Sequence, residues 1–114
     1  MPEDCLFCRI VAGEIPAEVV ARRDGFMAFR DIDPKAPQHV LVIPETHVPS
    51  IAGAVGLSAT ERAEMPLFIA EVAETLGLAD SGYRVTTNRG PDGRQRVFHL
   101  HWHVMGGAEL SATM

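Results

Sequence analysis

The alternation of apolar and polar residues divides the chain into short strands, each bounded by glycine, proline or aspartate. Five runs have strand character: 18–22, 26–30, 39–43, 83–88 and a run from 99 that ends at Gly106-Gly107. Asp24-Gly25, between the first two runs, predicts a tight hairpin. Most connections are short, which suits antiparallel neighbours, and only the connection between the third and fourth strands is long.

The long connection contains the main predicted helix. Ser58 opens it, because Ser58 and Glu61 can satisfy each other's free amide groups in a capping box. The apolar residues that follow have helical spacing up to a stop at Gly77: Leu67, Ile69, Ala70, Val72, Ala73 and Leu76. Pro66 predicts a kink or a helix in two pieces, because an interior proline costs ~3 kcal/mol.

A second, short helix is expected before the first strand, over 4–12. Asp4 is its expected N-cap and Gly13 its stop. With five strands and these helices, the chain is expected to have an α+β fold rather than a parallel βαβ arrangement. Its 114 residues suit one domain, 1–114, with 108–114 as a C-terminal tail.

Charge and hydropathy exclude some classes of function. Ten basic against fifteen acidic residues give a formal net charge of −5, which argues against electrostatic binding of nucleic acid or of an anionic membrane. A local basic site for one phosphate group is still compatible with this balance. No apolar run approaches the ~20 residues of a membrane span, and the first residues lack the pattern of a signal peptide. A cytoplasmic location is therefore expected.

Three of the five histidines stand at every second position: His99, His101 and His103. In an extended strand their imidazoles point to one face, and Leu100 and Trp102 point to the core. Same-face neighbours are ~6.6 Å apart and the outer pair ~13 Å apart. One metal with ligands at ~2 Å can therefore join two of them but not all three. We expect separate roles, with His101 acting on a substrate; solvent-facing histidines and a metal-binding strand are the alternatives.

The two cysteines, Cys5 and Cys8, have the spacing Cys-x-x-Cys. In a reducing compartment this spacing favours metal binding or redox chemistry over a structural disulfide. Two cysteines without a special function are the alternative.

The sequence His99-Leu100-His101-Trp102-His103-Val104 resembles the signature of the histidine triad (HIT) superfamily. Further segments resemble its Hint branch: 5–10 (CLFCRI), 14–17 (EIPA), 29–34 (FRDIDP) with 36–39 (APQH), and 88–90 (NRG) with 92–95 (DGRQ). They occur in the family's order and cover about 4–107, so the chain is identified as a bacterial-type member. The resemblance implies a five-stranded antiparallel sheet with one main helix and a short N-terminal helix.

The resemblance also implies an enzyme, a nucleotidyl hydrolase similar to purine nucleoside phosphoramidases. Its substrates would be purine nucleoside monophosphate conjugates, cleaved at P–N (or P–O–P) bonds. His101 would attack the α-phosphorus and form a nucleotidyl-histidine, because neutral imidazole has a nucleophilic nitrogen near pH 7. His103 would donate to the phosphoryl oxygens. A dinucleoside polyphosphate hydrolase and a nucleotide-binding protein with little turnover are the alternatives.

A nucleotide site is implied by the same resemblance. Asp31 matches the ribose ligand, a carboxylate that accepts from both hydroxyls, and a turn aspartate is the alternative. A base pocket is implied for Phe7, Ile10, Ile15, Phe29 and Leu41, each of which could equally be core. Ile32 is implied as a further nucleotide-binding residue. Phosphate contacts are implied at Asn88, Gly93, Gln95 and Val97.

Arg96 departs from the family, because the better-known Hint proteins have a serine at this position. A serine could assist the leaving group, whereas arginine cannot give up a proton but binds phosphate strongly. Two interpretations stay open: Arg96 faces the phosphate, or it points into solvent. The tail 108–114 is a second departure, since it lacks the tryptophan of Hint proteins from higher organisms.

A structural zinc site is the implied cofactor site. Cys5 and Cys8 match two ligands of the family's Zn²⁺, and His47 and His99 match the other two. Such a Cys₂His₂ site is tetrahedral and has no open position.

Two further expectations follow from the resemblance. His39 matches a family histidine near the triad, and we expect it to hold His103 or a water, with a purely structural histidine as the alternative. Family members form homodimers, in which the main helix and the fourth strand join two sheets into one of ten strands.

Overall fold

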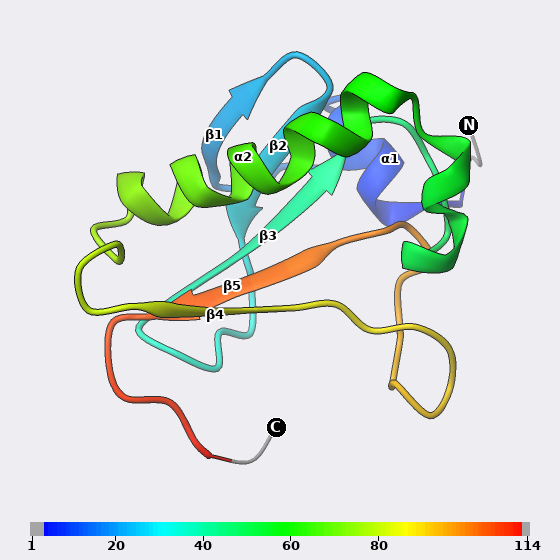
Figure 1. The fold of residues 1–114 in the computed structure, drawn as a ribbon. Helices are drawn as coiled ribbons and strands as arrows, with labels where there is room; N and C mark the ends of the chain where they lie inside the picture. Colours follow the sequence, from blue (N-terminus) through cyan, green and yellow to red (C-terminus); the bar gives the residue numbers. More distant parts are fainter. Residues whose placement is uncertain (1–3, 113–114) are drawn as a thin grey trace.

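The computed structural model describes residues 4–112, which form a five-stranded antiparallel sheet with a helix on each face (Figure 1). In chain order the elements are α1 (Leu6–Val11), β1 (Val19–Arg23), β2 (Phe26–Arg30), β3 (Gln38–Pro44), the 3-10 helix η1 (Ile51–Gly56), α2 (Ala59–Thr75), β4 (Tyr83–Thr86) and β5 (Trp102–Gly106). The strand order is β1-β2-β3-β5-β4. The predicted α+β class, five strands and two helices are confirmed. The end of the tail predicted at 108–114 lies outside the described residues.

Both faces of the central strands are covered, which explains why β2 and β3 are apolar at nearly every position. On β3, Val40 and Val42 belong to the core under α2. Leu41 and Ile43 belong to a second apolar cluster that includes α1. The alternation of strand side chains thus sorts the interior into an α2 side and an α1 side.

α2 begins with the predicted capping box and is continuous through Pro66. Ser58 Oγ accepts from the N–H of Glu61 at 3.0 Å, and Glu61 Oε1 accepts from the N–H of Ser58 at 2.8 Å. The predicted division into two pieces is wrong. Pro66 is exposed, so water can satisfy the carbonyl that loses its helical partner. Leu67 and Ala70 share this exposed face, against the prediction, and the buried residues are Met65, Phe68, Ile69, Val72 and Ala73.

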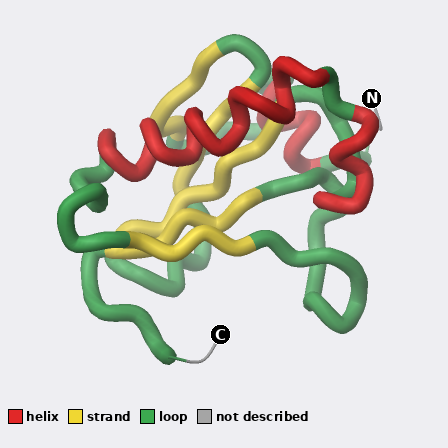
Figure 2. The backbone as a smooth tube through the Cα atoms, in the orientation of Figure 1, coloured by secondary structure: helices red, strands yellow, loops and turns green. Residues whose placement is uncertain are grey.

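Two predicted boundaries are wrong for identifiable reasons. The N-cap of α1 is Cys5 rather than Asp4, because Sγ of Cys5 accepts from the N–H of Cys8. The last strand begins at Trp102 rather than at 99, as Figure 2 shows by the loop that precedes β5. The N–H of Leu100 donates to the carbonyl of Val48 at 2.7 Å instead of to β3. His99 and His101 therefore lie outside the hydrogen-bonded sheet.

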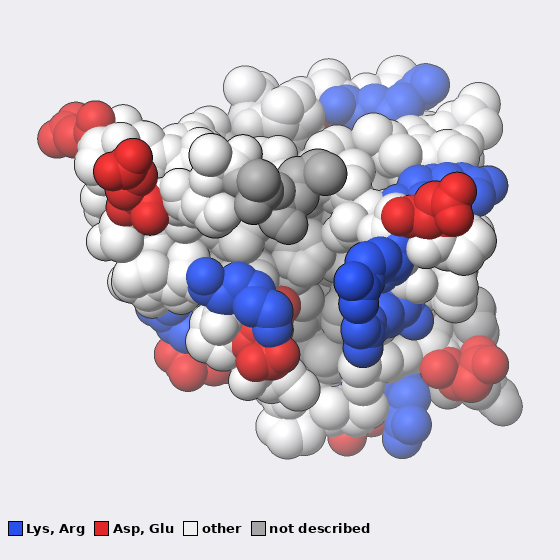
Figure 3. Space-filling view, turned by 90° about the horizontal axis from the view of Figure 1, so that it is seen from below, with Lys and Arg blue, Asp and Glu red and all other residues white. Residues whose placement is uncertain are grey.

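The surface agrees with the charge balance. Acidic and basic side chains are interspersed on the face drawn in Figure 3. On this face the described residues do not form the continuous basic surface that binds nucleic acid. Within 4–112, no helix is long and apolar enough to cross a membrane.

Candidate functional site

The candidate site is centred on the histidine segment 99–103, on the α1 side of the sheet. His99 and His101 are buried and His103 is half-buried. Leu100 and Val104 belong to the core under α2, so the side chains alternate as expected of an extended chain. The ring centroids of His101 and His103 are 5.3 Å apart, whereas His99 contacts the two cysteines. The three histidines therefore have different neighbours.

His101 is held with one ring nitrogen free. Its Nδ1–H donates to the carbonyl of His99 at 2.8 Å, so Nε2 carries a lone pair. The hydroxyl of Thr87 donates to the carbonyl of His101 at 2.7 Å, and the Phe7 ring lies edge-on to the imidazole at 5.1 Å. Burial lowers the pKa of His101, which the hydrogen bond to His99 opposes. A neutral imidazole with a free Nε2 is a competent nucleophile.

A chain of hydrogen bonds fixes the opposite tautomer of His103. The backbone N–H of Lys35 donates to Nδ1 of His39 at 2.9 Å, so His39 carries its proton on Nε2. This Nε2–H donates to Nδ1 of His103, also at 2.9 Å. His103 must then carry its own proton on Nε2 and act as a donor. The segment thus presents a lone pair on His101 and an N–H on its neighbour.

His103 should remain neutral well below neutral pH. Burial, followed by repulsion from His101 and His39, lowers its pKa from 6.5 to about 4. The unfolded chain then binds the proton first, so this contribution to stability is complete above about pH 6.5 and is lost as the pH falls toward 4. A ¹H–¹⁵N titration of the imidazoles measures the folded pKa, and urea unfolding measures the slope, which His103→Gln should reduce. A midpoint for His103 at or above 6.5 would contradict the assignment.

Asp31 lies beside this hydrogen-bonded pair. Its Oδ1 accepts from the N–H of Asp33 at 2.8 Å, and its Oδ2 is 3.5 Å from Nε2 of His39. Asp31 can therefore stabilise the turn and also bind a ribose, because the hydrogen bond within the turn uses only Oδ1 of its carboxylate. Asp31, His39 and His103 are also close enough to share a cation, but the hydrogen bond between the two histidines already accounts for their proximity.

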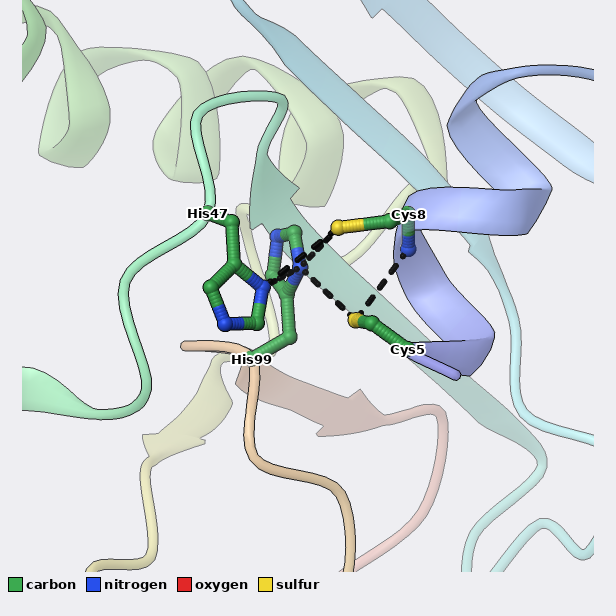
Figure 4. A group of neighbouring side chains, drawn as sticks. All are labelled: Cys5, Cys8, His47 and His99. Atoms are coloured by element: carbon green, nitrogen blue, oxygen red, sulfur yellow. Dashed lines mark hydrogen bonds between the residues drawn. The ribbon is translucent and has the colours of Figure 1, made fainter. Parts of the chain in front are cut away.

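All four predicted metal ligands come together around His99 (Figure 4). Cys5 and Cys8 come from the start of α1, and His47 from the loop after β3. Nδ1 of His99 is 3.4 Å from Sγ of Cys5 and 3.5 Å from Sγ of Cys8. Nδ1 of His47 is 3.4 Å from Sγ of Cys8 and 3.2 Å from Nδ1 of His99. These four side chains form a possible metal site.

The ligand geometry fits tetrahedral coordination. Bonds of ~2.3 Å to sulfur and ~2.0 Å to nitrogen place S and N ~3.6 Å apart and two nitrogens ~3.3 Å apart. Nε2–H of His99 donates to the carbonyl of Pro44 at 2.7 Å, which leaves Nδ1 unprotonated. Burial and the Cys5 thiol raise the pKa of Cys8 to about 11. A cation would reverse this shift, because it binds the thiolate.

Most of the predicted base-pocket residues lie in one apolar cluster on the α1 side. The cluster contains Phe7, Ile10, Phe29 and Leu41, with Ile15 and Val97 packed against it. Phe7 is edge-on to Phe29 at 5.4 Å, so it connects this cluster to His101. Ile32 is separate from the cluster, because its side chain is fully exposed.

The predicted phosphate loop, 88–97, is held by its own polar side chains. Nδ2–H of Asn88 donates to the carbonyl of Gly93 at 2.7 Å, and Nε2–H of Gln95 donates to that of Val97 at 3.1 Å. A Cβ at Gly93 would lie 2.6 Å from the carbonyl oxygen of Arg89, so only glycine fits. Asn88 and Gln95 therefore shape the loop.

Three exposed arginines lie on this loop: Arg89, Arg94 and Arg96. Among the residues that the structure describes, no side chain forms an ion pair or hydrogen bond with their guanidinium groups. By contrast, Arg22 and Arg30 pair with glutamates. The loop thus carries cationic groups that are available to a ligand.

Three contacts of the site involve residues that the sequence did not single out. Thr87 holds the backbone of His101, Lys35 supplies the N–H to His39, and Pro44 accepts from His99. The last two act through backbone groups, which leave no signature in side-chain chemistry. The only feature of the sequence that could have pointed to Thr87 is its position near the end of the predicted strand 83–88.

Comparison of the sequence with known proteins gives consistent matches. The profile of the HIT domain matches residues 12–110. Protein HitA of Neisseria gonorrhoeae is 42% identical over 104 residues, which cover 91% of this chain and 96% of that protein. The purine nucleoside phosphoramidase of Escherichia coli K12 is 37% identical over 114 residues, which cover 100% of this chain and 96% of that protein.

Solved structures match over the whole chain. A HIT family hydrolase from Clostridium thermocellum has a TM-score of 0.92 at 36% identity, and the match covers 100% of this chain and 99% of that one. A histidine triad protein from Clostridium difficile has a TM-score of 0.89 at 36% identity, with the same coverage of both chains.

Proposed function

Because the chain belongs to the histidine triad (HIT) family, we propose that it is a nucleotidyl hydrolase, similar to purine nucleoside phosphoramidases, that acts through a nucleotidyl-His101 intermediate. The observation that carries the proposal is the pair of opposite tautomers, a free Nε2 on His101 beside an Nε2–H on His103. A relative named purine nucleoside phosphoramidase, of which the match covers 96%, supports the substrate class. Steady-state turnover of an adenosine or guanosine phosphoramidate tests it.

The proposed reaction has two displacements at phosphorus. Nε2 of His101 attacks the α-phosphorus, a P–N bond to the imidazole forms, and the P–N bond to the leaving amine breaks as the amine takes up a proton from solvent, which the attacking water returns in the second step. Water then attacks the same phosphorus, releases the nucleoside monophosphate and returns a neutral His101. Nε2–H of His103 donates to the non-bridging oxygens as their charge grows in each step. Asp31 binds the ribose, and the cluster around Phe7 binds the base.

The metal of the Cys₂His₂ site is proposed to be structural Zn²⁺. Two thiolates and two imidazoles are an ordinary ligand set for zinc, and four protein ligands leave no open position for substrate. The ion would supply no step of the reaction. It would join α1, the loop of His47 and the segment of His99.

A dinucleoside polyphosphate hydrolase is the second candidate, and one observation favours it. The unpaired Arg89, Arg94 and Arg96 suit a leaving group that carries phosphates. Side-by-side assays of an adenosine phosphoramidate and a diadenosine polyphosphate separate the two functions. A protein that binds nucleoside monophosphate but hydrolyses neither would support a binding role instead.

Arg96 provides a specific prediction. If its guanidinium binds phosphate, Arg96→Ala should lower kcat/KM about tenfold, the effect of losing one charge-assisted hydrogen bond of roughly 1.4 kcal/mol. Arg22→Ala is the matched control, because Arg22 lies on the edge strand β1 and pairs with Glu45. Unchanged kinetics in Arg96→Ala would show that the side chain serves only the solvent-exposed surface.

The proposed assembly is a homodimer that joins the β4 edges of two sheets. β4 is a terminal strand of the sheet, so one of its backbone edges is unpaired. Beside it an open apolar groove of about 530 Å³ is lined by Ile51, Met65, Ile69, Tyr83, Val85 and Trp102. A second copy would bury this groove and extend the sheet to ten strands. Each copy would bind its own substrate, a purine nucleoside monophosphate conjugate.

A charge on this face should break the dimer. Val85 on β4 is 37% exposed, and Val85→Asp would place a carboxylate in the apolar interface. Analytical ultracentrifugation should give about twice 12.4 kDa for the wild type and 12.4 kDa for the variant. Val19→Asp is the matched control, since Val19 is 47% exposed on the opposite edge strand, β1. A wild-type monomer, or a dimer disrupted equally by both variants, would contradict the proposed interface.

A further inference from the structure

We propose that the Cys₂His₂ metal centre sets the tautomer and position of the nucleophile, His101, through the backbone of His99. The inference rests on the proposed function, since it concerns the same nucleophile. It assigns to the metal a second effect beyond holding the N-terminal segment in place.

His99 takes part in both sites at once. Its side chain presents Nδ1 to the sulfur atoms of Cys5 and Cys8, at 3.4 and 3.5 Å. Its backbone carbonyl accepts the Nδ1–H of His101 at 2.8 Å. Because this one hydrogen bond determines which nitrogen of His101 is free, the orientation of the His99 peptide determines the nucleophile. His99 is 0% exposed, so its side chain cannot turn without moving that peptide.

The sheet itself does not hold this peptide. β5 begins at Trp102, three residues after His99, and its register with β3 ends at the pair Val42 and Trp102. The backbone before Trp102 is held instead by two other contacts. The N–H of Leu100 donates to Val48, directly after the metal ligand His47, and the carbonyl of His101 accepts from the hydroxyl of Thr87. The side chain of His99 is therefore held from two sides, by the carbonyl of Pro44 at the end of β3 on Nε2 and by the metal centre on Nδ1. The segment that pairs with Leu100 directly follows the metal ligand His47.

α1 forms a second link between the metal and His101. Phe7 lies between the two cysteine ligands in sequence, and its ring is edge-on to His101 at 5.1 Å and to His99 at 6.0 Å. α1 has six residues, too few for a helix to be stable by itself. Ligation by Cys5 and Cys8 would fix this helix, and with it the ring that bounds the imidazole of His101.

The test compares the imidazole nitrogens of His101 in metal-loaded and metal-free protein. Wild type should contain one Zn²⁺ per chain, and its ¹H–¹⁵N spectrum should show His101 as a single Nδ1–H tautomer. In Cys5→Ser with Cys8→Ser, sheet amide signals should persist while His101 becomes a mixture of tautomers. Formation of nucleotidyl-His101 should then fall by about 10², the cost of misplacing a reacting group by roughly 1 Å. Leu6→Ala, on an exposed position of α1, should keep both metal and tautomer.

Should the double cysteine variant fail to fold, His47→Ala decides the question, because His47 does not contact His101 in the described structure. Stripped of metal, it should show mixed tautomers, and titration with Zn²⁺ should restore the single one. A single Nδ1–H tautomer that is independent of metal, or a wild type without metal, would overturn the inference. Neither result would affect the proposed hydrolysis. Conversely, absence of turnover with a metal-dependent tautomer would overturn only the proposed function.

Discussion

Replacing His101 with alanine should reduce turnover of a nucleoside phosphoramidate by about 10⁴-fold or more, the usual scale for removal of a covalent nucleophile. The reason is that Nε2 of His101 is the free lone pair in the site, whereas Nδ1 of His103 already accepts a hydrogen bond from His39. Single-turnover and steady-state kinetics on purified protein measure the loss.

Binding separates a chemical from a structural effect of this substitution. His101→Ala should bind nucleoside monophosphate within a few-fold of wild type, because the apolar cluster and Asp31 are unchanged. Calorimetry provides this measurement. Turnover that survives in the variant would show that His101 is not the nucleophile, and loss of binding together with loss of fold would show a structural role.

Replacing His103 with alanine should lower kcat by about 10²–10³, the effect of removing one donor that stabilises a developing oxyanion. The ground-state affinity for nucleoside monophosphate should change much less, since the donor acts on charge that grows in the transition state. Pre-steady-state kinetics of the formation and of the hydrolysis of nucleotidyl-His101 should show the loss in both chemical steps.

His39 gives this prediction a double-mutant test. His39→Ala should cost less than His103→Ala, because His39 acts only by fixing the tautomer of His103 through the 2.9 Å hydrogen bond. The double variant should be no slower than His103→Ala alone, which is the non-additivity expected of residues in one chain of hydrogen bonds. Fully additive losses would contradict the proposed chain from His39 to His103.

The sequence predicted those parts of the fold that depend on local pattern. Alternation placed His99, His101 and His103 on one side and Leu100 on the other, and the capping box at Ser58 marked the start of α2. The sequence could not predict the start of β5. The hydrogen bonds between β5 and β3 stop before Leu100, because the N–H of Leu100 donates to Val48, which is far away in sequence. The 3-10 helix 51–56 also went unpredicted, since Ala-Gly-Ala-Val-Gly carries no helical periodicity.

The site shows the same division. Cys5 and Cys8 could be proposed as metal ligands from their chemistry and spacing, whereas His47 and His99 were implied only by the resemblance. The structure brings all four together. The tautomers could not be predicted, because they depend on the backbone carbonyl of His99 and on other main-chain groups. The apolar pocket could not be told from core, because both are built from the same side chains and differ only in what lies beside them.

For two exposed residues, Ile32 and Arg96, the sequence predicts a role in nucleotide binding that the structure by itself does not test. Ile32 matches a nucleotide-binding position by resemblance but is fully exposed in the structure. Its role in nucleotide binding stays a prediction that requires a bound nucleotide to test. Arg96 is likewise exposed, and its role depends on a ligand rather than on any neighbour within the described chain.

The central claim, that His101 forms a covalent bond to phosphorus, is tested most directly by mass spectrometry of protein quenched during turnover of an adenosine phosphoramidate. We predict a peptide with one added nucleotidyl group, with the modification on His101 and none in His101→Ala. Rapid turnover without any modified peptide, or modification of a different residue, would contradict it.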